Sequence, residues 1–359
     1  MQLLSRGAES AYLTGNPEFS SYVKKYERYL PFALDTVEIP VDARFGLETA
    51  GAEYTCLIPP DTCDMIIDAH LMLTWAAKDV TRQLPQDSAH AVVDYVDLRV
   101  GGQTVARWPG ALLSLYEDIS RNAVTYTVDD YLAGKYVDFS GAVTQDIRRG
   151  GEFGFRLPLL GSGIAKAFPL CAIRHHALQV VVRISRAIIR TGKCTASVRI
   201  RGAYLDGTHR ARFTDVPLAY VYTQPQSQYL PLAKTPVRLR HPVYALCLAV
   251  RSSDTERLTF KRCVTSFSFQ LAGDALFEWT PVVHEYQFAQ AFSRYPAYWH
   301  FLGRSLSAPR GSVNMSRFRE QDVLVETDGS EGDNATRTIY ALSWQILYFR
   351  DGLCGIPYS

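Results

Sequence analysis

The side chains that could bind a metal ion form no recognised site in this sequence. His175 and His176 are adjacent, and adjacent residues of a strand point to opposite faces of its sheet, so their rings cannot share one ion. A short cluster of carboxylates, Asp61, Asp64 and Asp68, lacks the loop spacing of known calcium sites, and we interpret it as a solvated strand end. We therefore expect no metal site.

Motifs for catalysis and nucleotide binding do not occur either. The segment LGSGIA (160–165) lacks the spacing of a nucleophile elbow, and there is no P-loop and no G-x-G-x-x-G run. The seven cysteines include no C-x-x-C pair, and we expect them to be reduced, buried thiols. Sequons begin at Asn314 and Asn334 and would carry glycans only if the chain meets a glycosylation machinery. We expect neither an enzyme nor a cofactor.

Composition limits the class of protein further. Apolar residues make up 47% of the chain and charged residues 21%, which is typical of a globular protein. A net charge of +2 argues against a protein that binds nucleic acid through its phosphates. No apolar run approaches the roughly 20 residues that cross a bilayer, and the amino terminus lacks a signal peptide core. We expect a soluble chain made in the cytosol.

The elements that must position any functional residue read as strands almost throughout. Within residues 93–102, Val96 and Leu98 are expected to point to one face. Asp97 and Arg99 are expected to point to the opposite face. Similar period-two alternation occurs at 177–185, 197–202, 267–271 and 339–352. In the last of these, the predicted apolar face consists of Leu342, Trp344, Ile346 and Tyr348. Such alternation is typical of half-buried antiparallel strands.

Glycine-containing turns separate these strands, which predicts sandwiches or barrels. One strand-rich block covers about 37–206 and another 218–359, and each is long enough for an eight-stranded jelly roll. Residues 207–217 form a short helix or a linker between them, and 109–123 has helical spacing. We predict an all-β chain of two tandem eight-stranded antiparallel jelly rolls, with a few short helices in loops.

Residues 1–36 are predicted to be an amino-terminal arm rather than part of a core. A proline-fixed turn is followed by an aromatic-basic run, and such side chains suit contacts with another surface. The candidate assembly residues of this arm are Leu13, Thr14, Gly15, Asn16, Pro17, Tyr22, Lys24, Lys25, Tyr26, Arg28, Tyr29 and Phe32. The alternative is that the arm packs along its own first jelly roll.

Seven segments, in order along the chain, resemble the major capsid proteins of the nucleocytoplasmic large DNA viruses, such as phycodnaviruses and iridoviruses. The arm contains the Leu-Thr-Gly-Asn-Pro turn of that family. The other matching segments are 96–120, 168–184, 204–226, 240–251, 309–325 and 352–359. The chain departs from the family pattern at Arg240, where Asn is usual, and in its length, which is shorter than in most members.

The resemblance implies a structural protein of an icosahedral double-stranded DNA virus shell. It implies a double jelly roll that forms homotrimeric, pseudo-hexagonal capsomers in the virion after synthesis in the host cytoplasm. The implied partners are copies of the chain, neighbouring capsomers, minor capsid proteins, the penton protein and an inner membrane layer beneath the shell. Sequence-specific binding of nucleic acid is not implied.

Two alternatives remain at this stage. The chain could be a minor or paralogous capsid component of the same fold, which its shortened loops favour. It could instead be a carbohydrate-binding jelly-roll protein that uses its densest aromatic segment, Tyr295, Tyr298 and Trp299. No acidic residue closely flanks that segment, so we interpret these rings as filling the second jelly roll or facing a neighbour.

Overall fold

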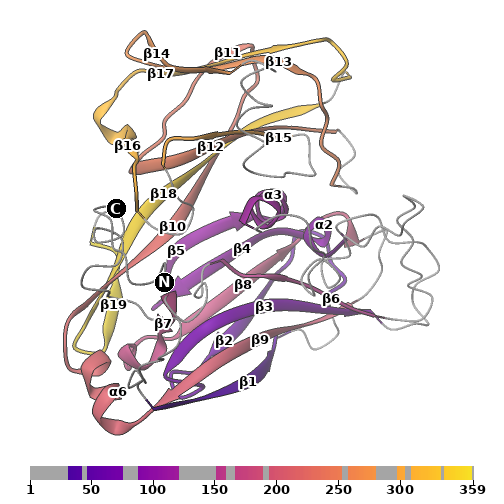
Figure 1. Ribbon diagram of the computed structural model, residues 1–359. Helices are drawn as coiled ribbons and strands as arrows, with labels where there is room; N and C mark the ends of the chain where they lie inside the picture. Colours follow the sequence, from indigo (N-terminus) through magenta and orange to yellow (C-terminus); the bar gives the residue numbers. More distant parts are fainter. Residues whose placement is uncertain are drawn as a thin grey trace, which may run out of the picture. The chain divides into compact units, whose positions relative to one another are not determined.

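The computed structural model (Figure 1) describes ten stretches of the chain: 31–42, 47–75, 88–120, 151–158, 166–188, 194–252, 258–279, 297–303, 309–332 and 335–357. Residues Ala33–Ser359 form one compact unit. Within the described stretches, most residues belong to antiparallel strands, and the helices are short. The whole fold can therefore be read from the order of its strands.

The first part of this unit is a sandwich of two sheets. One sheet has the order β1-β9-β3-β6, and the other has the order β2-β8-β4-β5. Their bounds are β1 (Phe32–Pro40), β2 (Glu53–Ile58), β3 (Met65–Trp75), β4 (Val93–Val100), β5 (Gln103–Pro109), β6 (Gly151–Arg156), β8 (Leu178–Ile184) and β9 (Cys194–Leu205). A two-residue strand, β7 (Phe168–Pro169), adds to β3.

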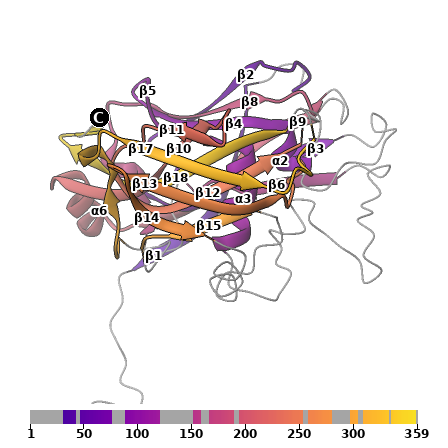
Figure 2. The same ribbon diagram turned by 90° about the horizontal axis from the view of Figure 1, so that it is seen from above.

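The second part repeats this construction. One sheet has the order β10-β18-β12-β15, and the other has the order β11-β17-β13-β14. Their bounds are β10 (Leu218–Tyr229), β11 (Lys234–Pro236), β12 (Pro242–Arg251), β13 (Val264–Leu271), β14 (Asp274–Trp279), β15 (Ala297–Phe301), β17 (Gln321–Thr327) and β18 (Thr336–Arg350). Two short strands extend the first of these sheets, β16 (Val313–Asn314) and β19 (Leu353–Gly355). Figure 2 shows β17, β13 and β14 running side by side.

The strand order is the same in both sandwiches. Without the short additional strands β7, β16 and β19, each sandwich has eight strands. When these eight are numbered in chain order, one sheet of each sandwich has the order 1-8-3-6 and the other has the order 2-7-4-5. This interleaving of two four-stranded sheets is the jelly-roll arrangement. The predicted fold class, two tandem eight-stranded antiparallel jelly rolls, is confirmed.

Tight hairpins close several neighbouring strand pairs. Gly101 and Gly102 join β4 to β5, and both have positive φ, 56° and 83°. Asp351 and Gly352 join β18 to β19 in the same way, with φ of 54° and 75°. Two successive positive φ values match the right-handed twist of the flanking strands, and glycine and aspartate tolerate them best. These glycine turns are the signals that the sequence offered.

Five short helices lie in the described connections: α2 (Ser88–Val92), α3 (Gly110–Ser120), η4 (Leu170–Ala172), α6 (Gly207–Thr214) and η5 (Met315–Arg317). Helix α3 confirms the helix predicted within 109–123 for residues 110–120, and 121–123 lie outside the described residues. Helix α6 connects β9 to β10, so the helical alternative holds for most of 207–217. The Asp206 carboxylate caps α6 by accepting a hydrogen bond of 2.8 Å from the His209 backbone nitrogen.

The two jelly rolls share a core. The Tyr244 and Trp344 rings of the second jelly roll stack at 4.2 Å and belong to the same buried cluster as Phe168 of the first. Phe168 in turn contacts Phe349 edge-on at 5.7 Å. The Tyr222 hydroxyl donates a hydrogen bond of 3.2 Å to the backbone oxygen of Val105 in β5. The sheet β10-β18-β12-β15 therefore buries parts of both faces.

This double burial corrects the predicted face of β18. Tyr348, expected inside, is 47% exposed, whereas Leu347 and Phe349, expected outside, are each 1% exposed. Ser343 is fully buried as well. A central strand covered on both faces does not alternate simply between buried and exposed, so the face prediction was wrong for the second half of the strand.

Asp97 lies on the outer face of β4, together with Arg99, as the alternation predicted. Its side chain is nevertheless fully buried. The Arg107 guanidinium donates two hydrogen bonds to its carboxylate, of 2.7 and 2.8 Å, and Arg99 donates another of 3.0 Å. The long arginine side chains cover the carboxylate, and the charged bonds offset its loss of water.

Candidate functional site

The candidate metal ligands of the sequence serve the fold. His175 and His176 lie in a bend before β8, outside the strand in which we expected them. The His175 backbone nitrogen donates a hydrogen bond of 3.1 Å to the Gly352 backbone oxygen. His176 Nδ1 lies 3.1 Å from the backbone oxygen of Cys354 and 3.3 Å from its nitrogen. The two histidines therefore connect the first jelly roll to β19.

The acidic cluster is also structural, and its interpretation as a solvated strand end was wrong for Asp64. That residue is 7% exposed, and its carboxylate accepts a hydrogen bond of 2.8 Å from the Leu205 backbone nitrogen. Arg210 Nε lies 3.1 Å from the same carboxylate. Asp68 pairs with Arg156. Among the described residues, no three His, Cys, Asp or Glu side chains are placed to hold one metal ion.

All seven cysteines are buried and unpaired, as predicted. Burial raises the pKa of Cys56, Cys194 and Cys354 to about 12. A thiol with such a pKa stays protonated at neutral pH and is a poor nucleophile. In the described part of the chain, no helix is long and apolar enough to cross a membrane.

The aromatic segment proposed for sugar binding lies in the core where it is described. Tyr298 and Trp299 of β15 are 3% and 1% exposed. The Tyr298 hydroxyl accepts a hydrogen bond of 3.0 Å from the Val264 backbone nitrogen, and its ring contacts Trp279 edge-on at 4.9 Å. Buried rings cannot form a stacking platform for a sugar. Tyr295 lies outside the described residues.

The predicted assembly arm lies almost wholly outside the described residues. Of its candidate residues, only Phe32 is described: it begins β1 and is 43% exposed. Asn314 is exposed, and its Oδ1 caps η5 by accepting a hydrogen bond of 3.1 Å from the Ser316 backbone nitrogen. Asn334 is not described. The roles assigned to these residues remain predictions.

An exposed apolar surface that the sequence did not indicate lies on one sheet of the second jelly roll. It consists of five residues of β10, β18 and β19, which we call the β10–β18–β19 patch: Ala219, Val221, Ile346, Tyr348 and Leu353. The register places Val221 opposite Ile346, and Ala219 opposite Tyr348.

The patch is open to solvent because these side chains point away from the shared core. Val221, Tyr348 and Leu353 are 39%, 47% and 48% exposed. The intervening residues Leu347 and Phe349 point the other way and are buried in the cluster shared with the first jelly roll. Exposed apolar residues that adjoin one another across neighbouring strands are candidates for contact with another protein.

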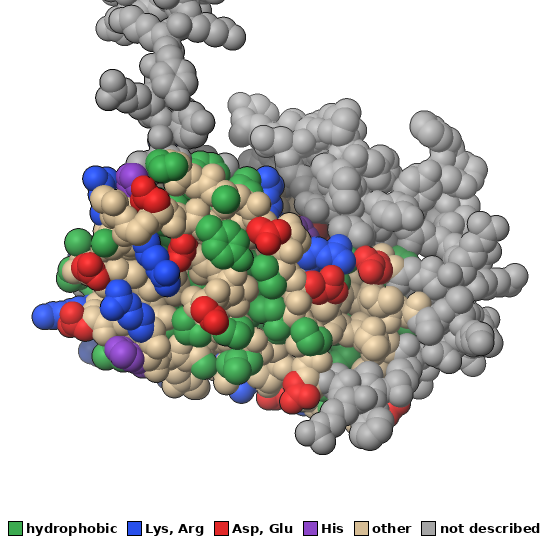
Figure 3. All heavy atoms as spheres, turned by 90° about the horizontal axis from the view of Figure 1, so that it is seen from below, with side chains coloured by type: hydrophobic (Ala, Val, Ile, Leu, Met, Phe, Trp, Pro, Cys, Tyr) green, Lys and Arg blue, Asp and Glu red, His purple; other side chains and the backbone are tan. Residues whose placement is uncertain are grey.

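The charges on one face of the molecule do not favour one kind of ligand. On the face shown in Figure 3, basic, acidic and hydrophobic side chains alternate, and no single charge covers the described part. This agrees with the net charge of +2. A protein that binds nucleic acid through its phosphates presents a basic stripe instead.

Comparison with known proteins gives no matching family model. The sequence is 23% identical to the major capsid protein of Pyramimonas orientalis virus, over 100% of this chain and 98% of that protein. It is 25% identical to the major capsid protein of Paramecium bursaria Chlorella virus 1, over 63% of this chain and 52% of that protein.

The structure is similar to the solved structure of PBCV-1 VP54, with a TM-score of 0.76 and 16% identity. The match covers 95% of this chain and all of VP54. The two jelly rolls of this chain therefore have the fold of VP54 over the whole length of that structure. The resemblance to the major capsid proteins of large DNA viruses is confirmed, both in sequence along the chain and in the double jelly-roll fold.

Proposed function

We propose that this chain is a structural capsid protein that builds a virion shell. The observation that carries the proposal is the repeated 1-8-3-6 and 2-7-4-5 strand order within one compact unit, together with the full-length match to a major capsid protein. We infer that the chain has no catalytic role and needs no cofactor, because its titratable residues described above are committed to holding the fold together.

The shell is proposed to be tiled by homotrimers with a pseudo-hexagonal outline. Three chains with two similar jelly rolls each supply six similar wedges, and cyclic symmetry lets every chain use the same contact surfaces. The proposed division of the chain is an arm at 1–36, jelly rolls at 37–206 and 218–359, and a connection at 207–217. Strand β1 begins at Phe32 and so overlaps the end of the proposed arm.

The β10–β18–β19 patch supports self-association. Stable interfaces between subunits commonly bury roughly 2,000 Å² or more and have an apolar centre. The patch offers such a centre on a rigid sheet, since its backbone is hydrogen-bonded across three strands. We propose that a second copy of the chain covers it in the capsomer.

The arm is proposed to tether the base of the capsomer. Its partners would be a neighbouring subunit, minor capsid proteins or the inner membrane layer, and the penton protein would contact the assembled shell. Deletion of residues 1–30 should leave soluble trimers that fail to assemble into larger shells. If the deletion instead prevents folding, the arm belongs to the core.

The contact proposed for the patch is tested with Val221→Asp. A charge at an apolar contact should convert trimers to monomers that remain folded, because Val221 is 39% exposed in the monomer and its own core does not depend on it. The matched control is Tyr348→Phe, which keeps the apolar ring and should remain trimeric. Trimers of unchanged stability in Val221→Asp would show that the patch lies outside the interface.

A further inference from the structure

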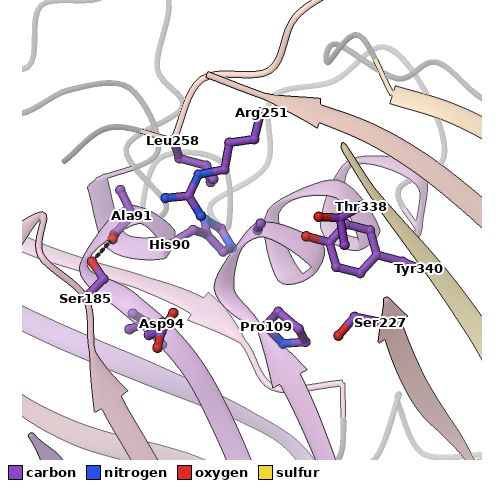
Figure 4. A pocket seen from close by; sticks show the side chains of 12 residues that line it. His90, Ala91, Asp94, Pro109, Ser185, Ser227, Arg251, Leu258, Thr338 and Tyr340 are labelled. Atoms are coloured by element: carbon purple, nitrogen blue, oxygen red, sulfur yellow. Dashed lines mark hydrogen bonds between the residues drawn. The ribbon is translucent and has the colours of Figure 1, made fainter. Parts of the chain in front are cut away.

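A pocket of about 210 Å³ lies between the two jelly rolls (Figure 4). The first jelly roll contributes His90 of α2, Asp94 of β4 and Ser185, which follows β8. The second contributes Arg251 of β12 and Tyr340 of β18. A neighbouring cavity of about 390 Å³ shares three of these residues, Asp94, Ser185 and Arg251, so the two spaces adjoin at Arg251.

The described side chains that line these two spaces carry more positive than negative charge. The Asp94 carboxylate lies 3.6 Å from Arg183 Nε, so an arginine already neutralises it. Arg186 also lines the larger cavity. Within the described part of the chain, no carboxylate pairs with the guanidinium of Arg251 or Arg186. Two cationic side chains at a partly enclosed site attract an anion, because a low dielectric strengthens their field.

His90 adds a buried polar atom at the same place. Its side chain is fully buried, its ring stacks on Phe155 at 4.5 Å, and its Nε2 lies 3.3 Å from a carboxylate oxygen of Glu117. The second ring nitrogen, Nδ1, has no hydrogen-bond partner among the described residues. In Figure 4 the His90 ring and the Arg251 side chain both point into the pocket. A buried polar atom without a partner costs free energy, and both ring nitrogens of His90 are shielded from solvent in the wall of the pocket.

Hydroxyl groups complete the lining. Ser227 and Thr338 face the pocket beside Tyr340, whose ring and hydroxyl point inward in Figure 4. Hydroxyls donate hydrogen bonds to oxygen ligands, and a guanidinium binds a phosphate or carboxylate through two parallel bonds. Because neither Arg251 nor Arg186 pairs with a carboxylate among the described residues, a dianion balances the site better than a monoanion.

We propose that this pocket binds a small oxyanion of the phosphate class, with Arg251 as its principal ligand. The volume admits inorganic phosphate or pyrophosphate and excludes a nucleic acid strand. Because residues of both jelly rolls line the site, the bound anion bridges them and stabilises the compact unit. The proposal does not depend on the capsid function.

The experiment is titration of the full-length chain with sodium phosphate and sodium pyrophosphate at constant ionic strength. Calorimetry should show saturable binding, and the melting temperature should rise with anion concentration, as expected for a ligand that binds the folded state. Arg251→Met should weaken binding at least tenfold. Arg238→Met, which removes an exposed arginine away from the pocket, should leave binding unchanged.

A control anion and a replacement variant complete the experiment. Sodium acetate should give no saturable signal, because one negative charge leaves an arginine unneutralised. If Arg251→Met does not fold, Arg251→Lys replaces it and should weaken binding while the fold persists. The proposal is overturned if the unmodified chain shows no saturable binding of phosphate or pyrophosphate at anion concentrations up to about 10 mM. It is equally overturned if Arg238→Met weakens binding as much as Arg251→Met.

Discussion

Replacing Trp344 with alanine should destabilise both jelly rolls together. The Trp344 ring stacks on Tyr244 at 4.2 Å with an interplanar angle of 20°, and it is 7% exposed. Lys166, which belongs to the first jelly roll, places its Nζ 5.8 Å from the centre of the ring. The variant therefore opens a cavity in the core that the two jelly rolls share.

The size of the effect follows from the lost packing. Truncating a buried aromatic side chain to alanine costs about 3–5 kcal/mol of unfolding free energy. The entropy of unfolding is about 2.1 cal/mol/K per residue, so a chain of this length loses roughly 1.3 °C of melting temperature per kcal/mol. We expect the melting temperature to fall by about 4–7 °C.

Scanning calorimetry at fixed protein concentration is the assay, since association would otherwise shift the transition. The unmodified chain should unfold in one transition, and Trp344→Ala should move that whole transition. Trp344→Phe retains a stacked ring and serves as the matched control, with a loss of about 1–2 kcal/mol. Two separate transitions, of which the variant shifts only one, would refute the shared core.

Three further variants test particular interactions. Asp97→Asn should lower the free energy of unfolding, measured with denaturant, by about 1–2 kcal/mol. The loss is modest because Arg107 is half-exposed and water partly screens its charge. An unchanged free energy would mean that the buried charge does not stabilise the fold. Gln321→Leu should cost about 2–4 kcal/mol, because the buried Gln321 amide makes four backbone hydrogen bonds. Burial lowers the pKa of His300 to about 4, so its folded ring stays neutral where the unfolded ring, with a pKa near 6.5, takes up a proton. The stability it supports is present above pH 6.5 and is lost as the pH falls toward 4, and His300→Phe should flatten unfolding free energies measured across that range. An unchanged slope in that variant would assign the loss to other groups.

The strands could be predicted from the sequence because their signals are local. Alternation located β8 and β13, and paired positive-φ residues fit the turns at Gly101 and Asp351. The order of the strands could not be predicted in this way. Strand β3 pairs with β9, more than a hundred residues later, and only the resemblance to a known family indicated such an arrangement.

The faces of the strands were harder to predict, because burial depends on what covers each sheet. Asp97 is buried by arginine side chains from its own sheet, which alternation cannot reveal. Tyr348 is exposed because it points away from the core that Phe349 enters. The β10–β18–β19 patch could not be predicted from the sequence either, because its exposure depends on which part of the sheet the first jelly roll covers.

Candidate sites made of neighbouring residues could be assessed from the sequence, whereas a site made of residues far apart in the chain could not. The sequence shows no catalytic motif, and the residues that it offered as metal ligands, His175, His176, Asp64 and Asp68, have contacts within the fold. The pocket at Arg251 could not be expected, since its lining comes from α2, β4, β12 and β18 and forms only when the two jelly rolls pack together. The arm, whose candidate residues except Phe32 precede β1, remains a prediction.

The mass of the purified chain in solution tests the central claim most directly. Native mass spectrometry or sedimentation should give three times the 40.3 kDa of a single chain, and electron micrographs should show a six-sided outline. A stable 40.3 kDa monomer at micromolar concentration, with no larger species, would contradict a protein built to pack against its own copies.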